Sequence, residues 1–298
     1  MPRAARRPGA ALASRARVPG PRGVSGSGTG VAEPVQSRLG STGPKRGPRL
    51  EDTMPVAFVS GASRGLGAVI ARRLAADGFA VAVNYGASRD GAERVVAGIR
   101  AAGGTAAAFG GDVTDEAAVA DLAERVRAEL GPVTVLVANA TGPQPEVRVD
   151  DLGWADHLAQ LEFFVKSPTL LLKAFLPDMR AAGGGRVVQI GSDMFERALA
   201  GWSAYVAAKG AQWGLTRSWA RELGGDGITV NLVAPGWTPV ERHGELTDAD
   251  VAGYLADVPM GRMGTPGDIA DAVSYLASDA ASFVTGQRLT VNGGHTID

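Results

Sequence analysis

A serine, a tyrosine and a lysine stand at a spacing that could move a proton. Ser192 follows the apolar run 186–191, Tyr205 comes thirteen residues later, and Lys209 lies four residues beyond Tyr205. Residues four apart share one face of a helix, so the Tyr205 phenol and the Lys209 ammonium would reach one site. A nearby cation favours the phenolate and lowers the pKa of a tyrosine from about 10, which suits the phenol to proton exchange at neutral pH. Ser192 could hydrogen-bond a substrate carbonyl from the end of its strand.

A glycine-rich stretch at 60–67 predicts a second part of the same site. It follows the apolar run 55–60 and carries Gly61, Gly65 and Gly67. Gly61 permits a tight turn, Gly65 lets backbone N–H groups approach a pyrophosphate, and Gly67 allows close packing of the helix on the strand. The spacing differs from the standard Gly-x-Gly-x-x-Gly, but its place between a first strand and a first helix favours a dinucleotide site. The other predicted cofactor contacts in this turn are Ser63, Arg64 and Leu66.

The end of the second strand indicates which dinucleotide is bound. NAD sites usually place an acid there to bond the ribose hydroxyls. In this chain the strand ends at Asn84, which is a further predicted cofactor contact. No acid lies between Asn84 and Asp90. Arg64 and Arg89 could both face a ribose 2′-phosphate, whose charged oxygens favour guanidinium groups. We therefore expect NADP (NADPH) rather than NAD.

The elements that must position these residues alternate between strand and helix from Met54 onward. Apolar runs predict buried parallel strands at 55–60, 79–84, 105–111, 133–138, 186–191, 228–233 and 288–291. Helical patterns cover 65–77, 88–102, 115–130, 151–181, 202–224 and 266–278, with Asp115 and Thr265 as N-caps. This order predicts an α/β fold, a doubly wound seven-stranded parallel sheet of the Rossmann-like type, in one domain at 54–298. Ligands of such sheets bind beyond the carboxyl ends of the strands.

Taken together, these motifs resemble the short-chain dehydrogenase/reductase family over residues 55–297. The nearest likeness is to bacterial 3-oxoacyl-thioester (acyl-carrier-protein) reductases. The matching pieces are the glycine turn, Asp112-Val113, Asn139-Ala140, Ser192 with Tyr205 and Lys209, the segment 231–236, and the endings 262–270 and 285–294.

The resemblance implies hydride transfer between a nicotinamide and a carbonyl or secondary alcohol. Tyr205 would be the general acid in reduction, Ser192 would orient and polarise the carbonyl, and Lys209 would bind the nicotinamide ribose and lower the pKa of Tyr205. Asp112 and Val113 would lie at the adenine, Asn139 and Ala140 along the cofactor groove, and Pro235, Gly236 and Thr238 at the nicotinamide end. Tyr205 and Lys209 would thus also contact the cofactor.

Two departures from the family pattern stand out. The Asn-Asn-Ala-Gly that the family carries after the fourth strand reads Ala-Asn-Ala-Thr at 138–141, which keeps the second Asn. The family's fourth helix usually carries an Asn that helps to hold a water against the lysine. That position is Phe164 in one registration and Leu161 in the other, in a segment about three residues longer than the usual pattern. The proton relay is the step that this change affects.

Composition excludes several classes of protein. The chain has 298 residues, no cysteine and three scattered histidines, which rules out disulfides, thiolate chemistry and a His-rich metal centre. No apolar run approaches the roughly 18 residues of a membrane span. We therefore expect a soluble, cytoplasmic protein with no metal and no membrane partner.

Residues 1–50 differ from the rest in charge. They hold ten basic residues and one acid, a net charge of +9, against 20 basic and 30 acidic residues, a net of −10, in 51–298. With seven Pro and nine Gly and no apolar period, we expect 1–53 to form a disordered basic extension. A transit peptide would need an amphipathic helix, and a nucleic-acid arm would be expected to offer aromatic side chains for stacking. We favour an extension that arises from the choice of start site, with Met54 as the domain's beginning.

Two further expectations concern substrate and assembly. The segment 237–263 is long enough to be a substrate lid. Its apolar residues either contact a carbonyl or acyl-thioester substrate with an apolar portion or pack the lid onto the body of the domain. The helices at 151–181 and 202–224 are apolar on several faces, and the family pairs these helices, so we expect a homodimer or homotetramer. The alternative to an enzyme is a cofactor-binding sensor or scaffold with weak or no turnover. Nucleic-acid binding through residues 1–50 is a third, less favoured hypothesis.

Overall fold

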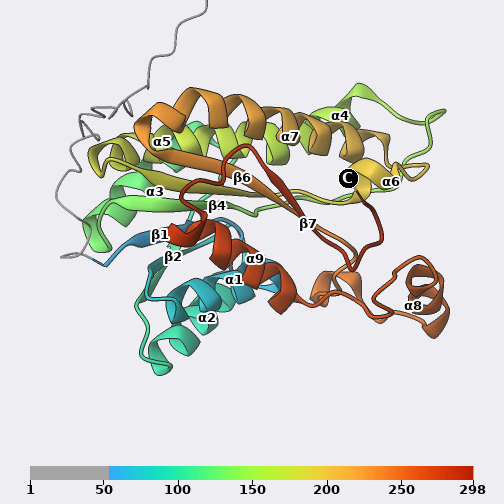
Figure 1. Cartoon of the computed structure of the whole chain (residues 1–298), viewed down its shortest axis with the longest axis horizontal. Coiled ribbons are helices and arrows are strands. Elements are labelled where there is room, and N and C mark those ends of the chain that lie inside the picture. The colour runs from blue at the N-terminus through green and yellow to red at the C-terminus, as the bar shows by residue number, and fades with distance from the viewer. Residues whose placement is uncertain (1–53, 298) are drawn as a thin grey trace, which may run out of the picture. The chain divides into compact units, whose positions relative to one another are not determined.

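The computed structural model describes residues 54–297, and the predicted extension at 1–53 lies outside them. A seven-stranded sheet, parallel throughout, runs in the order β3-β2-β1-β4-β5-β6-β7 (Figure 1). The strands are β1 (Val56–Val59), β2 (Ala80–Tyr85), β3 (Ala106–Gly110), β4 (Val133–Ala138), β5 (Gly185–Ile190), β6 (Ile228–Pro235) and β7 (Arg288–Val291). The order reverses between β1 and β4, so this is the point where ligands of a doubly wound sheet bind.

Helices cover both faces of the sheet, as Figure 1 shows. Their bounds are α1 (Gly65–Ala76), α2 (Arg89–Ala101), α3 (Glu116–Glu129), α4 (Trp154–Leu161), α5 (Ser167–Ala181), α6 (Met194–Arg197), α7 (Ser203–Leu223), α8 (Asp248–Leu255) and α9 (Pro266–Ala277). Successive residues of a strand point to opposite faces. Ala57 and Val59 accordingly pack with α1, α2 and α9, whereas Val56 and Phe58 pack with α3, α5 and α7. The predicted Rossmann-like fold is confirmed.

The predicted helix starts at Asp115 and Thr265 are confirmed by their hydrogen bonds. The Asp115 carboxylate accepts a bond from the Ala118 N–H at 2.7 Å. The Thr265 hydroxyl accepts one from the Asp268 N–H at 3.2 Å, and the Asp268 carboxylate accepts one from the Thr265 N–H at 2.7 Å. Each cap supplies a partner to backbone groups that the helix itself leaves unpaired.

The segment 151–181 is not one continuous α-helix. Helix α4 begins at Trp154, and a π-helical turn, η2 (Glu162–Lys166), joins it to α5. A π turn holds more residues than an α turn and commonly marks a functional site. Three short 3-10 turns complete the described helical elements: η3 (Gly224–Asp226), η4 (Glu241–His243) and η5 (Asp279–Ala281).

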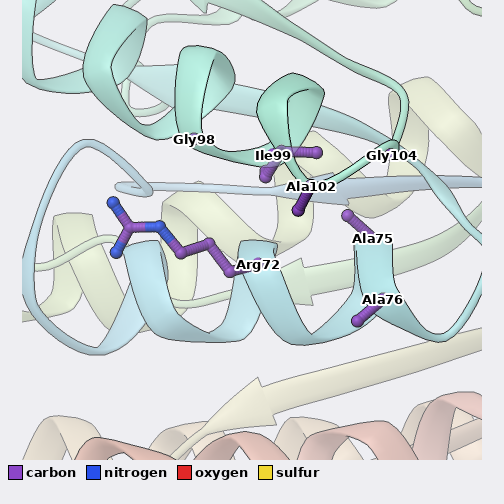
Figure 2. Close-up of a pocket in the computed structure, with 7 residues that line it drawn as sticks. All are labelled: Arg72, Ala75, Ala76, Gly98, Ile99, Ala102 and Gly104. Carbon is purple, nitrogen blue, oxygen red and sulfur yellow. The ribbon is translucent and has the colours of Figure 1, made fainter.

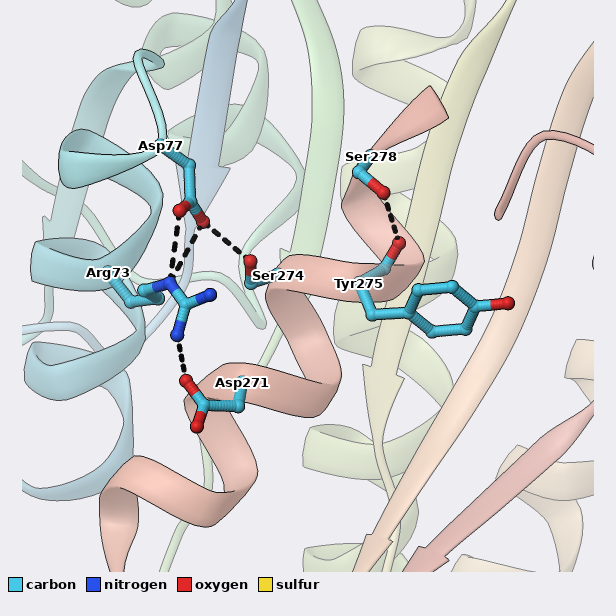
Figure 3. Close-up of polar contacts among 6 residues, drawn as sticks. All are labelled: Arg73, Asp77, Asp271, Ser274, Tyr275 and Ser278. Carbon is cyan, nitrogen blue, oxygen red and sulfur yellow. Dashed lines mark hydrogen bonds and ion pairs between the residues drawn. The ribbon is translucent and has the colours of Figure 1, made fainter. Parts of the chain in front are cut away.

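Polar contacts join α1 to α9, which are almost two hundred residues apart in sequence (Figure 3). Arg73 donates from Nε to both carboxylate oxygens of Asp77, at 3.0 and 3.2 Å, and also pairs with Asp271 of α9. The Ser274 hydroxyl of α9 donates to Asp77 at 2.6 Å. These bonds hold α1, whose first residues form the glycine turn, against the C-terminal part of the fold. No helix within 54–297 combines the length and apolar character needed to cross a membrane.

Candidate active site

The glycine turn forms a cradle that only glycine fits. Gly61 has φ +63° and Gly65 has φ +55°. A Cβ atom at Gly61 would lie 2.9 Å from the Ala140 Cα, and one at Gly67 would lie 2.4 Å from the Gly61 carbonyl oxygen. Helix α1 then starts with no acid in its first turn, and the Arg64 side chain makes no cap bond there in the described structure. A helix N-terminus with no acid in its own first turn suits an anionic group, and the turn fits a dinucleotide pyrophosphate.

A network of polar bonds beneath the turn joins β1 to β4. The Ser60 hydroxyl accepts bonds from the backbone N–H groups of Asn139 and Ala140, both at 2.9 Å. The Asn139 amide nitrogen donates to the Ser60 carbonyl at 2.9 Å and to the Gly61 carbonyl at 3.2 Å. Ser60 is a further candidate site residue that was not predicted, although a hydroxyl at the end of an apolar strand was its signal in the sequence.

Asn84 supports the same turn from the end of β2. Its side-chain oxygen accepts the Gly61 N–H at 3.2 Å, and its amide nitrogen donates to the carbonyls of Phe109 and Gly111 at 3.2 and 3.1 Å. Asn84 is 1% exposed. The structure therefore places Asn84 beneath the predicted cofactor site, with its side chain engaged by the protein, and the direct contact with the cofactor stays a prediction.

The two arginines expected at the ribose phosphate lie at the same end of the sheet. Arg64 directly precedes α1 and is exposed, and Arg89, the first residue of α2, is exposed and 3.9 Å from Glu93. A Cβ at Gly91 would lie 2.8 Å from the Ser63 carbonyl oxygen, so the start of α2 packs against the glycine turn.

The predicted adenine contacts follow β3. The Asp112 carboxylate is exposed and accepts bonds from the Thr114 N–H at 2.8 Å and the Thr114 hydroxyl at 2.7 Å. Val113 is buried in the core on the α3 side of the sheet. In the glycine turn, Leu66 packs partly buried against the core on the other side.

Lys209 ties the first turns of α7 to the end of β5. It is 4% exposed, and its ammonium donates to the Ile190 carbonyl at 2.7 Å and to the Gln212 side-chain oxygen at 3.2 Å. Ile190 is the last residue of β5 and lies two residues before Ser192. The Tyr205 ring centroid is 5.6 Å from the Lys209 Nζ, as the helical spacing predicted. The Ser192 hydroxyl accepts the Met194 N–H at 3.1 Å, which leaves its hydrogen for a donor bond.

Aromatic rings enclose Tyr205 on two sides. Phe164 of η2 makes an edge-to-face contact with Tyr205 at a centroid distance of 5.4 Å, and Trp202 makes another at 5.8 Å. The face of Phe164 lies 3.7 Å from the Lys209 Nζ. Phe164 and Leu161 were the two candidate positions for the family's missing Asn, and Phe164 is the one whose ring contacts Lys209. Gln212 was missed, although its spacing of three from Lys209 places both on one helix face.

The predicted nicotinamide end follows β6, which ends at Pro235. The buried Thr238 donates from its hydroxyl to the Gly236 carbonyl at 3.2 Å. The Trp237 N–H donates to the Tyr254 hydroxyl at 2.9 Å, so helix α8 of the segment 237–263 is anchored to this turn. Burial raises the pKa of the Tyr254 phenol, although the bond from Trp237 opposes the shift.

Asp193 directly follows Ser192 in the sequence, and its hydrogen bonds connect the end of β5 with the end of β6. Its N–H donates to the Pro235 carbonyl at 3.0 Å, and its carboxylate accepts from the Asn292 amide at 3.4 Å. Asp193 is 1% exposed, and burial raises the pKa of its carboxyl, while Arg197 nearby acts in the opposite direction. The residue directly after Ser192 is therefore held by hydrogen bonds from both its backbone and its side chain.

A hollow elsewhere on the surface has no part in this site. It holds about 120 Å³ between α1 and α2 (Figure 2). Its lining residues are Arg72, Ala75, Ala76, Gly98, Ile99, Ala102 and Gly104. That volume is well below the roughly 300 Å³ at which ligand pockets begin, and the lining includes no acid or nucleophile. Within 54–297, no cluster of His, Cys, Asp or Glu side chains is arranged to hold a metal ion.

Comparisons with known proteins agree with this geometry. A family model described as Enoyl-(Acyl carrier protein) reductase matches residues 61–296. The 3-oxoacyl-[acyl-carrier-protein] reductase FabG of Escherichia coli K12 is 40% identical over 241 residues, which cover 80% of this chain and 96% of that protein.

Solved structures show the same likeness. A mutant short-chain dehydrogenase/reductase of Serratia marcescens superposes with a TM-score of 0.77 at 35% identity, covering 82% of this chain and 99% of that one. A blue fluorescent protein from a metagenomic library, in complex with NADPH, gives a TM-score of 0.76 at 36% identity, covering 84% of this chain and 100% of that one.

Proposed function

This chain belongs to the short-chain dehydrogenase/reductase family, and from that premise we propose that it is an NADPH-dependent ketoreductase acting on 3-oxoacyl thioesters or related apolar ketones. The family makes it an NAD(P)-dependent oxidoreductase acting on CH–OH and C=O groups. The choice of NADPH, the direction of reduction and the substrate class are the parts that we propose.

One contact carries the proposal. The buried Lys209 ammonium reaches the Ile190 carbonyl at 2.7 Å, and this bond brings a cation of α7 to the strand end that bears Ser192. Tyr205 stands one helical turn before Lys209 on the same face. A fixed cation and a phenol on one helix face therefore lie at the carboxyl edge of the sheet, at the strand end that carries the Ser192 hydroxyl. The glycine cradle follows β1 at the same edge.

The residues divide the proposed reaction among themselves. When bound, the nicotinamide cofactor supplies the hydride. Ser192 donates a hydrogen bond to the substrate carbonyl and orients it, and Tyr205 donates its phenolic proton to the carbonyl oxygen. Lys209 stabilises the phenolate that remains on Tyr205, because an ammonium beside a phenol favours the charged form.

The preference for NADPH is supported by charge. Arg64 and Arg89 are exposed beside the glycine turn, whereas Asn84 at the end of β2 is neutral and buried. Two guanidinium groups near a ribose suit a 2′-phosphate better than two hydroxyls. A structural neighbour in complex with NADPH is consistent with this choice.

The proposed substrate class is supported by the apolar side chains around the serine and the segment 237–263. Met194 and Phe195 follow Ser192 within α6, and Phe195 is 41% exposed. Met260 is 65% exposed at the end of the 237–263 segment. Exposed apolar side chains beside a reacting centre favour a substrate with an apolar portion. The relative FabG is named for an acyl thioester of this kind.

A homo-oligomer is the proposed assembly, through the outer face of α5 and α7. Trp213 and Trp219 of α7 remain partly exposed. A shallow hollow of about 120 Å³ lies between the two helices, lined by Thr169, Leu172, Lys173, Leu176, Trp219, Glu222 and Leu223. Light scattering should give a mass of two or four chains, and Trp219→Lys should reduce it, whereas a parent mass of one chain would contradict this assembly.

The proposed activity is tested by NADPH oxidation across β-ketoacyl thioesters, quinones and simple ketones, with Tyr205→Phe as the blank. Turnover by the parent chain that disappears in the variant would support the reductase. The alternative, a cofactor-binding protein without turnover, draws on Phe164 in place of the family's Asn. This alternative predicts that the folded protein binds NADPH but that no substrate of the panel causes NADPH oxidation. That outcome would overturn the proposed activity on these substrate classes.

A further inference from the structure

Phe164 lies with its ring face against the Lys209 ammonium. The ring centroid is 3.7 Å from Nζ, and Phe164 is 3% exposed. The same ring makes the edge-to-face contact with Tyr205, at an interplanar angle of 87°. An aromatic face attracts a cation through its quadrupole, and the attraction is stronger where water is excluded. One apolar side chain thus contacts both members of the proposed proton-transfer pair.

The π turn is what presents Phe164 to this position. Among the five residues of η2, Phe164 is the buried one. Glu162 and Lys166, at the two ends of the turn, are exposed and lie 3.9 Å from each other. The turn therefore directs its aromatic ring inward and its charged side chains to solvent.

Gln212 supplies a second contact with the same ammonium. It is 2% exposed, and its side-chain oxygen accepts from Lys209 at 3.2 Å. Its backbone carbonyl accepts the Thr216 hydroxyl at 3.0 Å, and Gln189 of β5 donates to that hydroxyl at 2.9 Å. The turn of α7 that carries Gln212 is thus tied to the core of the sheet, so the acceptor for Lys209 is fixed in place.

We propose that Phe164 and Gln212 are positioning residues that keep the Lys209 ammonium charged and fixed beside Tyr205. This role rests on the proposed reductase function. Burial alone would favour the neutral amine, and an isolated buried charge is destabilising. Three groups offset the cost of burying this charge. They are the quadrupole of the Phe164 ring face, the amide dipole of Gln212 and the carbonyl of Ile190.

The described elements that pack here carry further charged or titratable groups: Asp156 and His157 on α4, Glu196 and Arg197 on α6, and Arg217, Arg221 and Glu222 on α7. Asp193 follows β5 and is bound by Asn292, and the Glu162–Lys166 pair of η2 is exposed. Tyr205 on α7 is the titratable group whose ring the ammonium approaches, at 5.6 Å. A change in how Lys209 is held should therefore be detected in the titration of Tyr205.

The test compares Phe164→Leu with Phe175→Leu. Phe175 is fully buried on α5 and packs at 4.8 Å against Phe58, so its loss removes a ring from the core without touching Lys209. Tyrosinate absorbance is titrated in the cofactor-free chain, and subtraction of each protein's Tyr205→Phe counterpart isolates the Tyr205 phenol. The pH profile of kcat is measured in parallel on any ketone that is turned over.

Phe164→Leu should move the Tyr205 titration to higher pH by about 0.5 unit or more, because a less firmly held cation favours the phenolate less. It should lower kcat by about 3- to 30-fold with little change in KM for the ketone. Phe164→Trp, which restores a ring face, should recover most of both effects. Phe175→Leu should lower stability and leave the titration unchanged.

If Phe164→Leu does not fold, Gln212→Met provides a second test. It removes the side-chain oxygen that accepts from Lys209, with little change in volume, and should also move the Tyr205 titration to higher pH. An unchanged Tyr205 titration in a folded Phe164→Leu or Gln212→Met chain overturns the proposal. So does an equal shift in Phe175→Leu. Because the titration needs no substrate, its failure is distinct from a failure to find turnover.

Discussion

The imidazole Nδ1 of His295 lies 3.8 Å from the Oδ2 of Asp193. Asp193 directly follows Ser192, so the end of the described chain packs against the segment that bears the proposed catalytic hydroxyl. Tyr254 of α8 stacks edge-on against His295 at a centroid distance of 4.7 Å. The C-terminal residues, the segment 237–263 and the serine segment therefore meet at one buried carboxylate.

This buried carboxylate should make stability depend on pH. Burial raises the pKa of Asp193 in the folded state above its unfolded value. A raised carboxyl pKa favours folding at low pH, and that contribution is lost as pH rises from about 4 through the folded pKa. Asp193→Asn cannot titrate, so its free energy of unfolding relative to the parent should increase over that window, by at most about 1.4 kcal/mol per pH unit.

Urea unfolding between pH 4 and pH 8 measures this difference. Asp257→Asn, which removes an exposed carboxyl from the same half of the chain, is the matched control. A difference for Asp193→Asn that stays flat, or falls with rising pH, would contradict the assignment of burial as the dominant cause.

Gly67→Ala should destabilise the domain and weaken cofactor binding. Its Cβ would lie 2.4 Å from the Gly61 carbonyl oxygen and 2.6 Å from the Asn139 amide nitrogen, both parts of the cradle. Overpacking of this kind costs about 1–3 kcal/mol. Gly214→Ala in α7 is the matched control, because a Cβ there meets nothing within 4 Å and should stabilise by about 0.5–1 kcal/mol. Thermal unfolding and NADPH titration check both, and equal effects would argue against a tight cradle.

Arg64→Ala and Arg89→Ala should reduce the preference for NADPH over NADH. Loss of a charge-assisted bond to a 2′-phosphate lowers kcat/KM for NADPH by about tenfold or more and leaves kcat/KM for NADH nearly unchanged. Arg94→Ala removes another exposed guanidinium further along α2 and should preserve the ratio. Initial rates with both cofactors measure it. A parent chain that prefers NADH would refute the proposal at once.

Glu241→Gln should tighten NADPH binding. The Glu241 carboxylate oxygen lies 3.6 Å from the point that a Gly65 Cβ would occupy, at the N-terminus of α1. A carboxylate there competes with a phosphate for the helix N-terminus, an interaction of about 0.3–1 kcal/mol, so Kd should fall about two- to fivefold. Glu245→Gln in the same segment is the control. Fluorescence titration decides between this outcome and an unchanged or larger Kd.

The strands and the glycine cradle could be predicted from the sequence because their determinants are local. A parallel strand buried on both faces must be apolar throughout, so β1 and β4 were found to within about one residue at their ends. Gly61 and Gly67 follow a strand at the one place where a dinucleotide turn needs them. Tyr205 and Lys209 could be paired because helical spacing alone places residues four apart on one face.

Contacts between distant segments could be found only in the tertiary structure. The apolar period of 151–181 predicted one helix, since periodicity cannot distinguish an α turn from the π turn that brings Phe164 to Lys209. The short helices α6 and α8 were not predicted either, because neither has a long apolar period of its own.

The sequence by itself determined the order of elements, the cradle and the choice of the proposed reacting side chains, because each follows from spacing along a single strand, turn or helix. Packing decided what surrounds them. Lys209 meets an aromatic ring and the Ile190 carbonyl, and Asp193 meets His295 about a hundred residues away, because folding the sheet places these segments together. Burial then determines how strongly each charge is held, and burial is a property of the whole fold.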